Sequence, residues 1–431
     1  MRKQSLAYIL LVLSLVGLSI WPLNLAAAEE NWPTIIQQLE AAHATNNADT
    51  KISSSLATAY NNYGLTFAHQ KQWQQAEIYL QKAAATDPSN KNIRLNLSNI
   101  YFEHGFELFQ SPDSNAFGGS SHSQAKQLAT QAIEFNPNNI NAILLLGDVE
   151  YMNQNMQEAQ ASWQKAALLA PQNQQIKQRL DKISREANTE SGMQDRYNTY
   201  FIIKINRDSD NIPGFDISAS LDAARIAVSN DFNYLQKHKI PVIVYSVSEY
   251  QSTLKDAPEW SDGAYDGKLR IILYKNRPNF KQVNSTIVHE YTHAVIADLT
   301  DNNCPRWFNE GIAKYEEYKH GVKPLISVLA MAYNTNNLLA WDHVDNAYLS
   351  SSKSEVLLAY EQSFSFIHYI VDKYGMSKLV YLLNSLSSNP DFADAFAKTY
   401  GVQLTQVQKD WKFWVSNYIE TWAETPTQMV D

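Results

Sequence analysis

Cysteine is nearly absent from this sequence of 431 residues, and Cys304 is the single example. An intramolecular disulfide is therefore impossible. Runs of lysine and arginine are also missing, and the formal net charge of −9 becomes −11 when residues 1–28, with Arg2 and Lys3, are left out. An acidic chain without such runs is not expected to bind nucleic acid. Its length and its 45% hydrophobic content suit a globular protein of two or three domains.

The N-terminal apolar run, residues 6–16, is too short for a comfortable membrane span. It follows two basic residues and precedes three alanines at 26–28, which are typical of a cleavage site. We predict a signal peptide over 1–28, a periplasmic or secreted mature protein, and no stable membrane span after cleavage. An uncleaved anchor is the alternative. No cysteine follows the run, which excludes lipid anchoring through an N-terminal cysteine.

Small residues and a closing proline recur with the spacing 12, 7 and 5 in two segments, Gly64, Ala76, Ala83 and Pro88, then Gly147, Ala159, Ala166 and Pro171. The second half of this pattern returns at Ala125, Ala132 and Pro137, and an insertion near 111–121 accounts for the extra length before it. The 34 residues from Ala132 to Ala166 equal the period of a tetratricopeptide unit. We therefore predict an all-α repeat domain over 29–190, with a further helix within 29–51. Its groove either binds a protein partner or only positions the next domain.

The periodicity changes after a polar stretch, residues 187–192, that is typical of a linker. Runs rich in β-branched residues predict strands at 200–205, 241–245 and 269–274. One helical face is predicted between the first two strands, through Leu221, Ala224, Val228, Phe232 and Leu235. Further helices are expected at 356–373, around 379–383, and at 404–422. The fold class is thus α+β: helical repeats, then a domain over 191–431 with a small mixed sheet and a helical C-terminal half.

The sequence His-Glu-x-x-His occurs once, at 289–293. In a helix, residues four apart share a face, so His289 and His293 can direct two imidazoles at one metal ion. Glu290 lies beside the first histidine and can take a proton from water without being a ligand. Asn284 or Ser285 is expected to cap this helix. The bland alternative is a surface helix with two unrelated histidines.

A catalytic zinc ion usually takes three protein ligands. Residues 305–315 read as a second helix after a proline, and sixteen residues separate His293 from Glu310. That distance allows a turn at 301–303 and a return alongside the first helix. Glu310 could then face both histidines.

His-Glu-Tyr-Thr-His at 289–293, followed by Trp-Phe-Asn-Glu-Gly-Ile-Ala at 307–313, resembles the gluzincin metallopeptidases, and most closely the peptidase MA-like domains of bacterial envelope proteins. The resemblance implies a thermolysin-like zincin fold, Zn2+ as cofactor and Glu310 as third ligand. The segment 360–367 is similar to one that carries an oxyanion-binding tyrosine in related aminopeptidases, which would be Tyr360. A core tyrosine is the alternative reading.

The chain departs from one branch of that clan, because it lacks the Gly-x-Met-Glu-Asn motif by which gluzincin aminopeptidases hold a free amino terminus. This favours an endopeptidase. Residues 263–267 resemble the lead into the strand that binds substrate backbone in gluzincins, or they form only a hairpin turn.

Other candidates have plainer readings. His320, His343 and His368 have no metal-ligand spacing, and Cys304 is expected to be a small buried residue rather than a ligand. Either Glu316 or Glu317 could orient a ligand histidine, and the sequence does not choose between them.

These observations predict an exported zinc metallopeptidase acting on peptide or protein substrates. Glu290 would serve as the base, and the metal would be held by His289, His293 and Glu310. The alternative is an envelope adaptor, weak or inactive as a catalyst, whose repeats bind partners.

Overall fold

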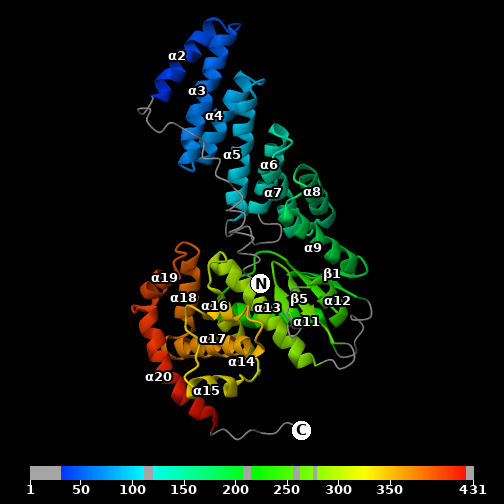
Figure 1. Ribbon diagram of the computed structural model, residues 1–431, viewed down its shortest axis with the longest axis vertical. Helices are drawn as coiled ribbons and strands as arrows, with labels where there is room; N and C mark the ends of the chain where they lie inside the picture. Colours follow the sequence, from blue (N-terminus) through cyan, green and yellow to red (C-terminus); the bar gives the residue numbers. More distant parts are fainter. Residues whose placement is uncertain (1–30, 111–119, 207–214, 256–262, 275–278, 424–431) are drawn as a thin grey trace. The chain divides into compact units, whose positions relative to one another are not determined.

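A computed structural model describes residues 31–110, 120–206, 215–255, 263–274 and 279–423 (Figure 1). The chain divides into two compact units, with the boundary between residues 187 and 188. The predicted signal peptide, residues 1–28, lies outside the described residues. Among the described helices, none is both long and apolar enough to span a membrane.

The N-terminal unit is built from antiparallel helix pairs, as the repeat predicted. A single helix, α2 (Trp32–Thr45), precedes them and fulfils the expectation of a further helix within 29–51. The pairs are α3 (Thr50–His69) with α4 (Trp73–Thr86), α5 (Lys91–Phe109) with α6 (Ser120–Phe135), and α7 (Ile140–Met152) with α8 (Met156–Leu169). Helix α9 (Gln174–Glu190) follows. The predicted insertion falls between α5 and α6, and its residues 111–119 are outside the described part.

The repeated small residues lie where paired helices come closest. All six alanines of the pattern are completely buried, Ala76, Ala83, Ala125, Ala132, Ala159 and Ala166. A β-carbon on Gly64 would lie 2.9 Å from Leu80 Cγ, so only glycine allows α3 to approach α4 so closely. The prolines follow the ends of α4, α6 and α8, where a helix can no longer continue.

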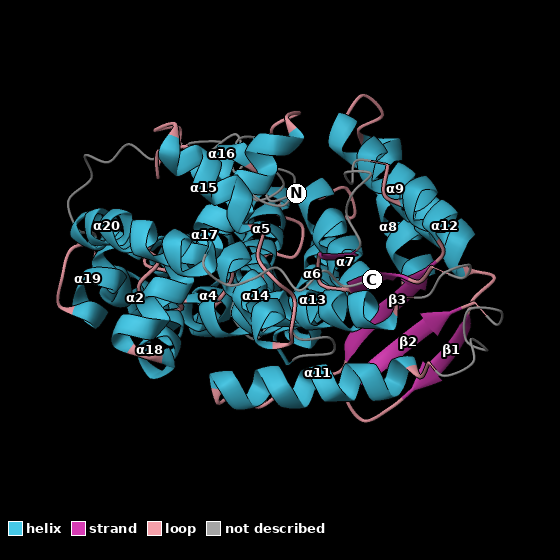
Figure 2. Cartoon of the chain, turned by 90° about the horizontal axis from the view of Figure 1, so that it is seen from below, coloured by secondary structure: helices cyan, strands magenta, loops and turns pink. Residues whose placement is uncertain are grey.

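The C-terminal unit begins with a five-stranded mixed sheet in the order β1-β2-β3-β5-β4. Its strands are β1 (Gln194–Tyr197), β2 (Phe201–Ile205), β3 (Ile240–Tyr245), β4 (Gly263–Tyr265) and β5 (Leu269–Ile272). The three predicted strands form the parallel centre, β2-β3-β5, and β1 and β4 pair antiparallel at the two edges. One face packs on α11 (Ile217–Phe232), which runs along the sheet in Figure 2, and on α13 (Phe280–Thr300). The other face is covered by α12 (Val247–Thr253).

Helices make up the rest of this unit. They are α14 (Arg306–Lys319), α15 (Ile326–Asn334), α16 (Val344–Ala347), α17 (Lys353–Tyr374), α18 (Met376–Leu386), α19 (Phe392–Tyr400) and α20 (Leu404–Ala423). The predicted helices at 356–373, 379–383 and 404–422 are thus present as α17, α18 and α20. One hydrophobic core joins them to α13 and the sheet, so the helix that carries His-Glu-x-x-His is held from several sides.

Two expectations are wrong in detail. The boundary between the two units falls within the predicted linker, residues 187–192, but the first four of these residues are helical, because α9 continues to Glu190, whose buried carboxylate lies 3.8 Å from Lys268 Nζ. Leu235 is not part of the apolar face of α11. That helix ends at Phe232, its C-cap Asn233 adopts a left-handed conformation, and the Leu235 side chain beyond it is 77% exposed.

Candidate metal centre

The N-cap of the helix that carries both histidines, α13, lies five or six residues earlier than the sequence suggested. Asn279 is its N-cap, and its side-chain oxygen accepts a hydrogen bond from the backbone N–H of Gln282 at 3.2 Å. The expected caps, Asn284 and Ser285, are therefore internal to the helix. The two residues between Glu290 and His293, Tyr291 and Thr292, are completely buried. This burial orients the opposite face, with the two histidines, toward α14.

The turn between α13 and α14 forms where it was predicted. Asp301 and Asn302 take φ values of +54° and +57°, the left-handed conformation that asparagine and aspartate tolerate best among non-glycine residues. Helix α14 then starts after Pro305, and Asp345 of α16 accepts a hydrogen bond from Trp307 N at 2.7 Å. The second helix consequently returns alongside the first.

His289, His293 and Glu310 are brought together by this return. Nε2 of each histidine lies 3.4 Å from Oε2 of Glu310, and the three potential ligand atoms all lie within 4.8 Å of one another. The imidazole rings are nearly perpendicular, with centroids 4.6 Å apart. Both nitrogens and the carboxylate oxygen thus face one point between the helices.

The other nitrogen of each imidazole is held by α14. Nδ1 of His289 lies 2.5 Å from Oε1 of Glu317, and Nδ1 of His293 lies 2.7 Å from Oδ1 of Asn309. An acceptor at Nδ1 keeps the proton there and leaves the lone pair of Nε2 available to a metal. Of the two acids left open by the sequence, it is Glu317 that reaches a histidine. Glu316 instead lies 3.7 Å from Lys319.

The charges in the centre favour a bound cation. Burial lowers the pKa of His289, but Glu317 and Glu310 outweigh it and raise that pKa to about 10. Burial would raise the pKa of Glu310, yet the imidazoles of His293 and His289 hold it well below its usual range. Burial raises the pKa of Glu290 to about 7, against the opposing effect of both imidazoles.

The donor set fits a zinc ion. Zinc in proteins prefers imidazole nitrogen and carboxylate oxygen, and its catalytic sites use three such ligands. Oε2 of Glu310 is buried and has no well-formed hydrogen bond within the described residues, so its lone pairs are available to a cation. His293 carries the second hydrogen bond that is usual for metal-ligating histidines, and Nδ1 of His289 lies in ion-pair distance of the Glu317 carboxylate.

Glu290 faces the edge of the sheet. A β-carbon added at Gly263, in the edge strand β4, would lie 2.9 Å from Oε1 of Glu290, so the carboxylate lies directly against the backbone of that strand. Strand β4 turns into β5 through Asp266 and Gly267, where φ is +92°. Residues 263–267 therefore contain the edge strand β4 beside Glu290 and the turn into β5. The strand into which they were expected to lead, β5, is not at the edge but lies inside the sheet between β3 and β4.

Tyr360 lies on α17, close enough to the centre to be affected by its charges. Burial raises its pKa well above the usual value, and Glu310 and Glu290 raise it further. Its ring packs edge-on against Tyr348 at 4.9 Å. The Tyr348 hydroxyl is committed to hydrogen bonds with the carbonyl of Ala359 and with Ser363, and so is less suited to contact a substrate.

Gly311 lets α17 come this close. A β-carbon at this position of α14 would lie 2.6 Å from the carbonyl oxygen of Ser363 and 2.8 Å from Ile367 Cγ1. The glycine after Glu310 is therefore needed for packing, because any side chain would push α17 away.

We expect Gly311→Ala to destabilise the protein by about 1–3 kcal/mol, since the added methyl overpacks a helix contact made by backbone atoms. In an open helix position the same change would stabilise by nearly 1 kcal/mol, so the sign of the effect is decisive. Urea unfolding followed by circular dichroism measures it. Gly192→Ala, where a β-carbon meets nothing within 4 Å, is the control and should be nearly neutral. If Gly311→Ala instead stabilised the protein, α17 would have to shift to make room for the added methyl group, and the close contact would not require glycine.

The remaining sequence candidates lie away from the ligand atoms. Cys304 is buried in the hydrophobic core, as expected. Nδ1 of His320 hydrogen-bonds to the backbone carbonyl of Glu316 at the end of α14, and His343 lies beside Glu355 at the surface. His368 is enclosed by aromatic rings that include Tyr318, Trp414 and Tyr418.

Two residues around the centre, Asn309 and Lys314, had no role in the sequence reading, which also left the choice between Glu316 and Glu317 open. Lys314 Nζ donates to Oε2 of Glu317 at 2.8 Å. Asn309 could have been noticed because it directly precedes Glu310. No local signal marked Lys314. Its partner, Glu317, is three residues further along the helix, but Glu316 is directly beside it and the sequence does not show which acid the lysine meets.

Comparison with protein families gives a match that lies within the C-terminal unit. Residues 222–417 match a family model described as the peptidase MA superfamily. The comparison with curated proteins gave no match.

Three of the similar solved structures are tetratricopeptide domains. The domain of Arabidopsis OM64 is 21% identical, with 30% of this chain and 96% of that chain covered and a TM-score of 0.22. The first domain of Spaghetti (RPAP3), bound to an HSP90 peptide, is 20% identical, with 31% and 93% covered and a TM-score of 0.23. The second domain of human RPAP3, in complex with an HSP70 peptide, is 20% identical, with 30% and 94% covered and a TM-score of 0.22.

Proposed function

We propose, on the premise that residues 222–417 belong to the peptidase MA superfamily, that this chain is a zinc-dependent peptide hydrolase. One observation carries the proposal: Nε2 of His289 and Nε2 of His293 both lie 3.4 Å from Oε2 of Glu310, and each Nδ1 is held by an acceptor on α14. Zinc, when bound, supplies the Lewis acidity that makes a water more acidic and polarises a peptide carbonyl.

The chain's own residues would do the rest. Glu290 would take one proton from the attacking water while the oxygen of that water forms a bond to the carbonyl carbon of the substrate. The C–N bond then breaks, and Glu290 would pass that proton to the leaving nitrogen, which departs as the amine. Glu290 is well placed for this, because it is 6% exposed and adjacent to His289. Tyr360 is the proposed hydrogen-bond donor to the negatively charged oxygen that develops from the substrate carbonyl.

An extended substrate has a natural place beside β4. Among the described strands β4 pairs only with β5, and the Gly263 carbonyl also accepts a hydrogen bond from the Tyr250 hydroxyl. An extended peptide would add to this edge of the sheet. Such pairing fixes the peptide backbone next to Glu290 without selecting side chains. Because pairing along a strand does not require a free end, it supports the proposal of an endopeptidase. We also propose that the protein acts outside the cytoplasm, on the basis of residues 1–28.

A metal and activity assay tests the main proposal. The full chain purified without chelator should contain about one zinc per molecule by inductively coupled plasma mass spectrometry, and it should cleave casein or an unstructured peptide library. Incubation with a chelator should abolish cleavage, and added zinc should restore it. Absence of zinc, or cleavage that is unaffected when the metal is removed, would contradict the proposal.

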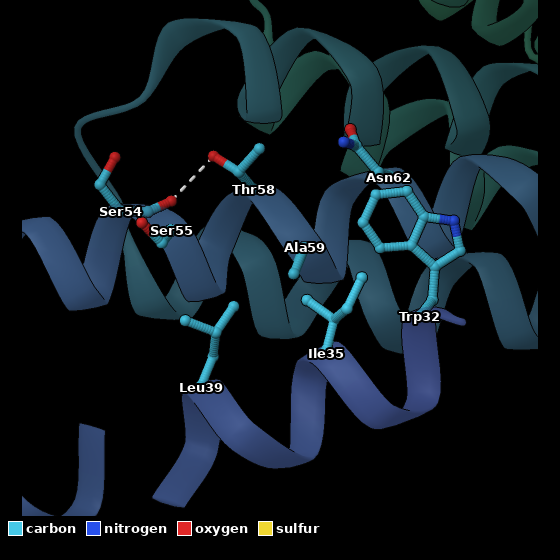
Figure 3. Close-up of a pocket in the computed structure, with 8 residues that line it drawn as sticks. All are labelled: Trp32, Ile35, Leu39, Ser54, Ser55, Thr58, Ala59 and Asn62. Carbon is cyan, nitrogen blue, oxygen red and sulfur yellow. Dashed lines mark hydrogen bonds between the residues drawn. The ribbon is translucent and has the colours of Figure 1, made fainter. Parts of the chain in front are cut away.

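A second candidate function, partner binding through the helical repeats, is favoured by a pocket in the N-terminal unit. It has a volume of about 450 Å³ and lies between α2 and α3. Figure 3 shows its apolar wall, with Trp32, Ile35 and Leu39, facing the hydroxyl-bearing residues Ser54, Ser55 and Thr58. Apolar surface with a few polar groups is typical of ligand pockets. If the purified chain contained zinc but cleaved no member of the library, this adaptor function would be the better account.

A further inference from the structure

Helix α14 presents three charged residues on one stripe. Glu310, Lys314 and Glu317 are spaced four and three apart, so their side chains lie above one another on the same face. The outer two reach α13, where Glu310 faces both histidines and Glu317 meets His289. Lys314 therefore lies between a proposed zinc ligand and the carboxylate that orients another ligand.

Glu317 uses both of its oxygens. Oε1 lies 2.5 Å from Nδ1 of His289, and Oε2 accepts a hydrogen bond from Nζ of Lys314 at 2.8 Å. A carboxylate that is held at both oxygens cannot rotate without losing one charge-assisted bond. The position of the His289 ring is in this way linked to the lysine one turn away.

The charge of Lys314 is influenced by more than one carboxylate. Its side chain is 23% exposed, and burial lowers its pKa, but the charges of Glu317, of the buried Glu361 on α17 and of Glu310 outweigh burial and raise that pKa. The lysine therefore compensates several carboxylates that converge from α14 and α17. Without it, Glu317 would have an unpaired buried oxygen and would lack the bond that fixes its orientation.

We propose that Lys314 is a positioning residue of the metal centre, which holds Glu317 against Nδ1 of His289 so that Nε2 is directed at the bound metal. This inference rests on the proposed function, because it assumes that the metal is zinc held by His289, His293 and Glu310. The lysine touches neither metal nor substrate and acts through Glu317 alone. Loss of a residue that orients a histidine ligand typically weakens metal affinity by about 10- to 100-fold.

The same helix offers a matched control. Lys319 is 30% exposed, pairs with Asp231 and lies 3.7 Å from the buried Glu316. It resembles Lys314 in its helix, its burial and its neighbouring glutamate, but it has no contact with a ligand histidine in the described part of the chain. A general loss of stability would affect both lysine variants, whereas a loss of histidine orientation would affect only one.

The experiment is a zinc competition titration of the full chain with a chromophoric chelator, alongside thermal unfolding of the metal-free proteins. We expect Lys314→Met to raise the zinc dissociation constant by about 10-fold or more, Lys319→Met to leave it near the wild-type value, and Lys314→Arg to restore most of the affinity. If Lys314→Met fails to fold, Lys314→Gln supplies the same comparison.

Each outcome is decisive. Wild-type affinity in a folded Lys314→Met or Lys314→Gln protein overturns the inference, and so does an equal loss in Lys319→Met. A wild-type protein that binds zinc separates this failure from a failure of the proposed function, whereas a wild-type protein that binds none overturns both.

Discussion

The Glu290→Gln protein is expected to keep its zinc and to lose peptide hydrolysis by about 10²- to 10⁴-fold, the usual contribution of a general base. Glutamine has nearly the same shape as glutamate but cannot accept and return a proton. The metal should stay, because the three proposed ligand atoms belong to His289, His293 and Glu310, and Glu290 points instead at the backbone of β4. Metal content by mass spectrometry and initial rates on a fluorescent casein measure the two effects separately.

The matched control is Glu316→Gln, which also converts a buried carboxylate to an amide, six residues beyond Glu310 on α14. It should cleave casein at the wild-type rate at pH 7. Undiminished turnover in Glu290→Gln would remove Glu290 from the mechanism. A protein that lost zinc together with activity would instead show that Glu290 supports the metal.

Glu316→Gln should also stabilise the protein, and increasingly so as the pH rises. The Glu316 carboxyl is completely buried, neither of its oxygens has a well-formed hydrogen bond among the described residues, and Lys319 is 3.7 Å away. Burial raises the pKa of Glu316 from 4.5 to about 8, with Lys319 opposing the rise and Asp231 adding to it. The folded protein thus holds a proton that the unfolded chain has already released above pH 4.5.

The sign follows from proton linkage. Between pH 4.5 and 8 the folded state binds more protons at this site than the unfolded state, so the free energy of unfolding falls as the pH rises and levels off above pH 8. At about 1.4 kcal/mol per pH unit, the loss amounts to a few kcal/mol. Glutamine does not titrate, so we expect the variant to exceed the wild type by roughly 2 kcal/mol or more at pH 9 and by much less at pH 5.

Urea unfolding of the C-terminal unit at pH 5, 7 and 9 measures this difference. Glu420→Gln, at an exposed position of α20, is the control and should follow the wild-type pH dependence. A difference between Glu316→Gln and wild type that stayed constant from pH 5 to 9 would mean that Glu316 is already ionised in the folded protein.

Much of the fold was accessible from the sequence because its signals are local. The repeated alanines and prolines of the N-terminal unit mark helix contacts and helix ends within a few residues of themselves, and all six alanines proved to be buried. The β-branched runs predicted the three central strands for the same reason. The short edge strands β1 and β4 were not predicted, because three or four residues without a clear alternation carry little pattern.

Local signals failed where another part of the chain decides. Residues 187–192 look like a linker, yet Lys204 of β2 and Lys268, which directly precedes β5, lie within 4.0 Å of Glu190 and favour the continuation of α9. Asn284 is a good cap by composition, but the helix core extends back to Phe280 and Asn279 takes that role. In both cases tertiary contacts outweigh a preference worth about 1 kcal/mol.

By itself, the sequence determined the helix bearing His289 and His293, the turn at 301–303 and the helix bearing Glu310, because each depends on spacing within a short segment. Only the tertiary structure decided that Glu317, not Glu316, meets His289, that Asn309 meets His293, and that Lys314 pairs with Glu317. The reason is geometric. Neighbouring residues on a helix point about 100° apart, so the packing of α14 between α13 and α17 determines which of them reaches the metal centre.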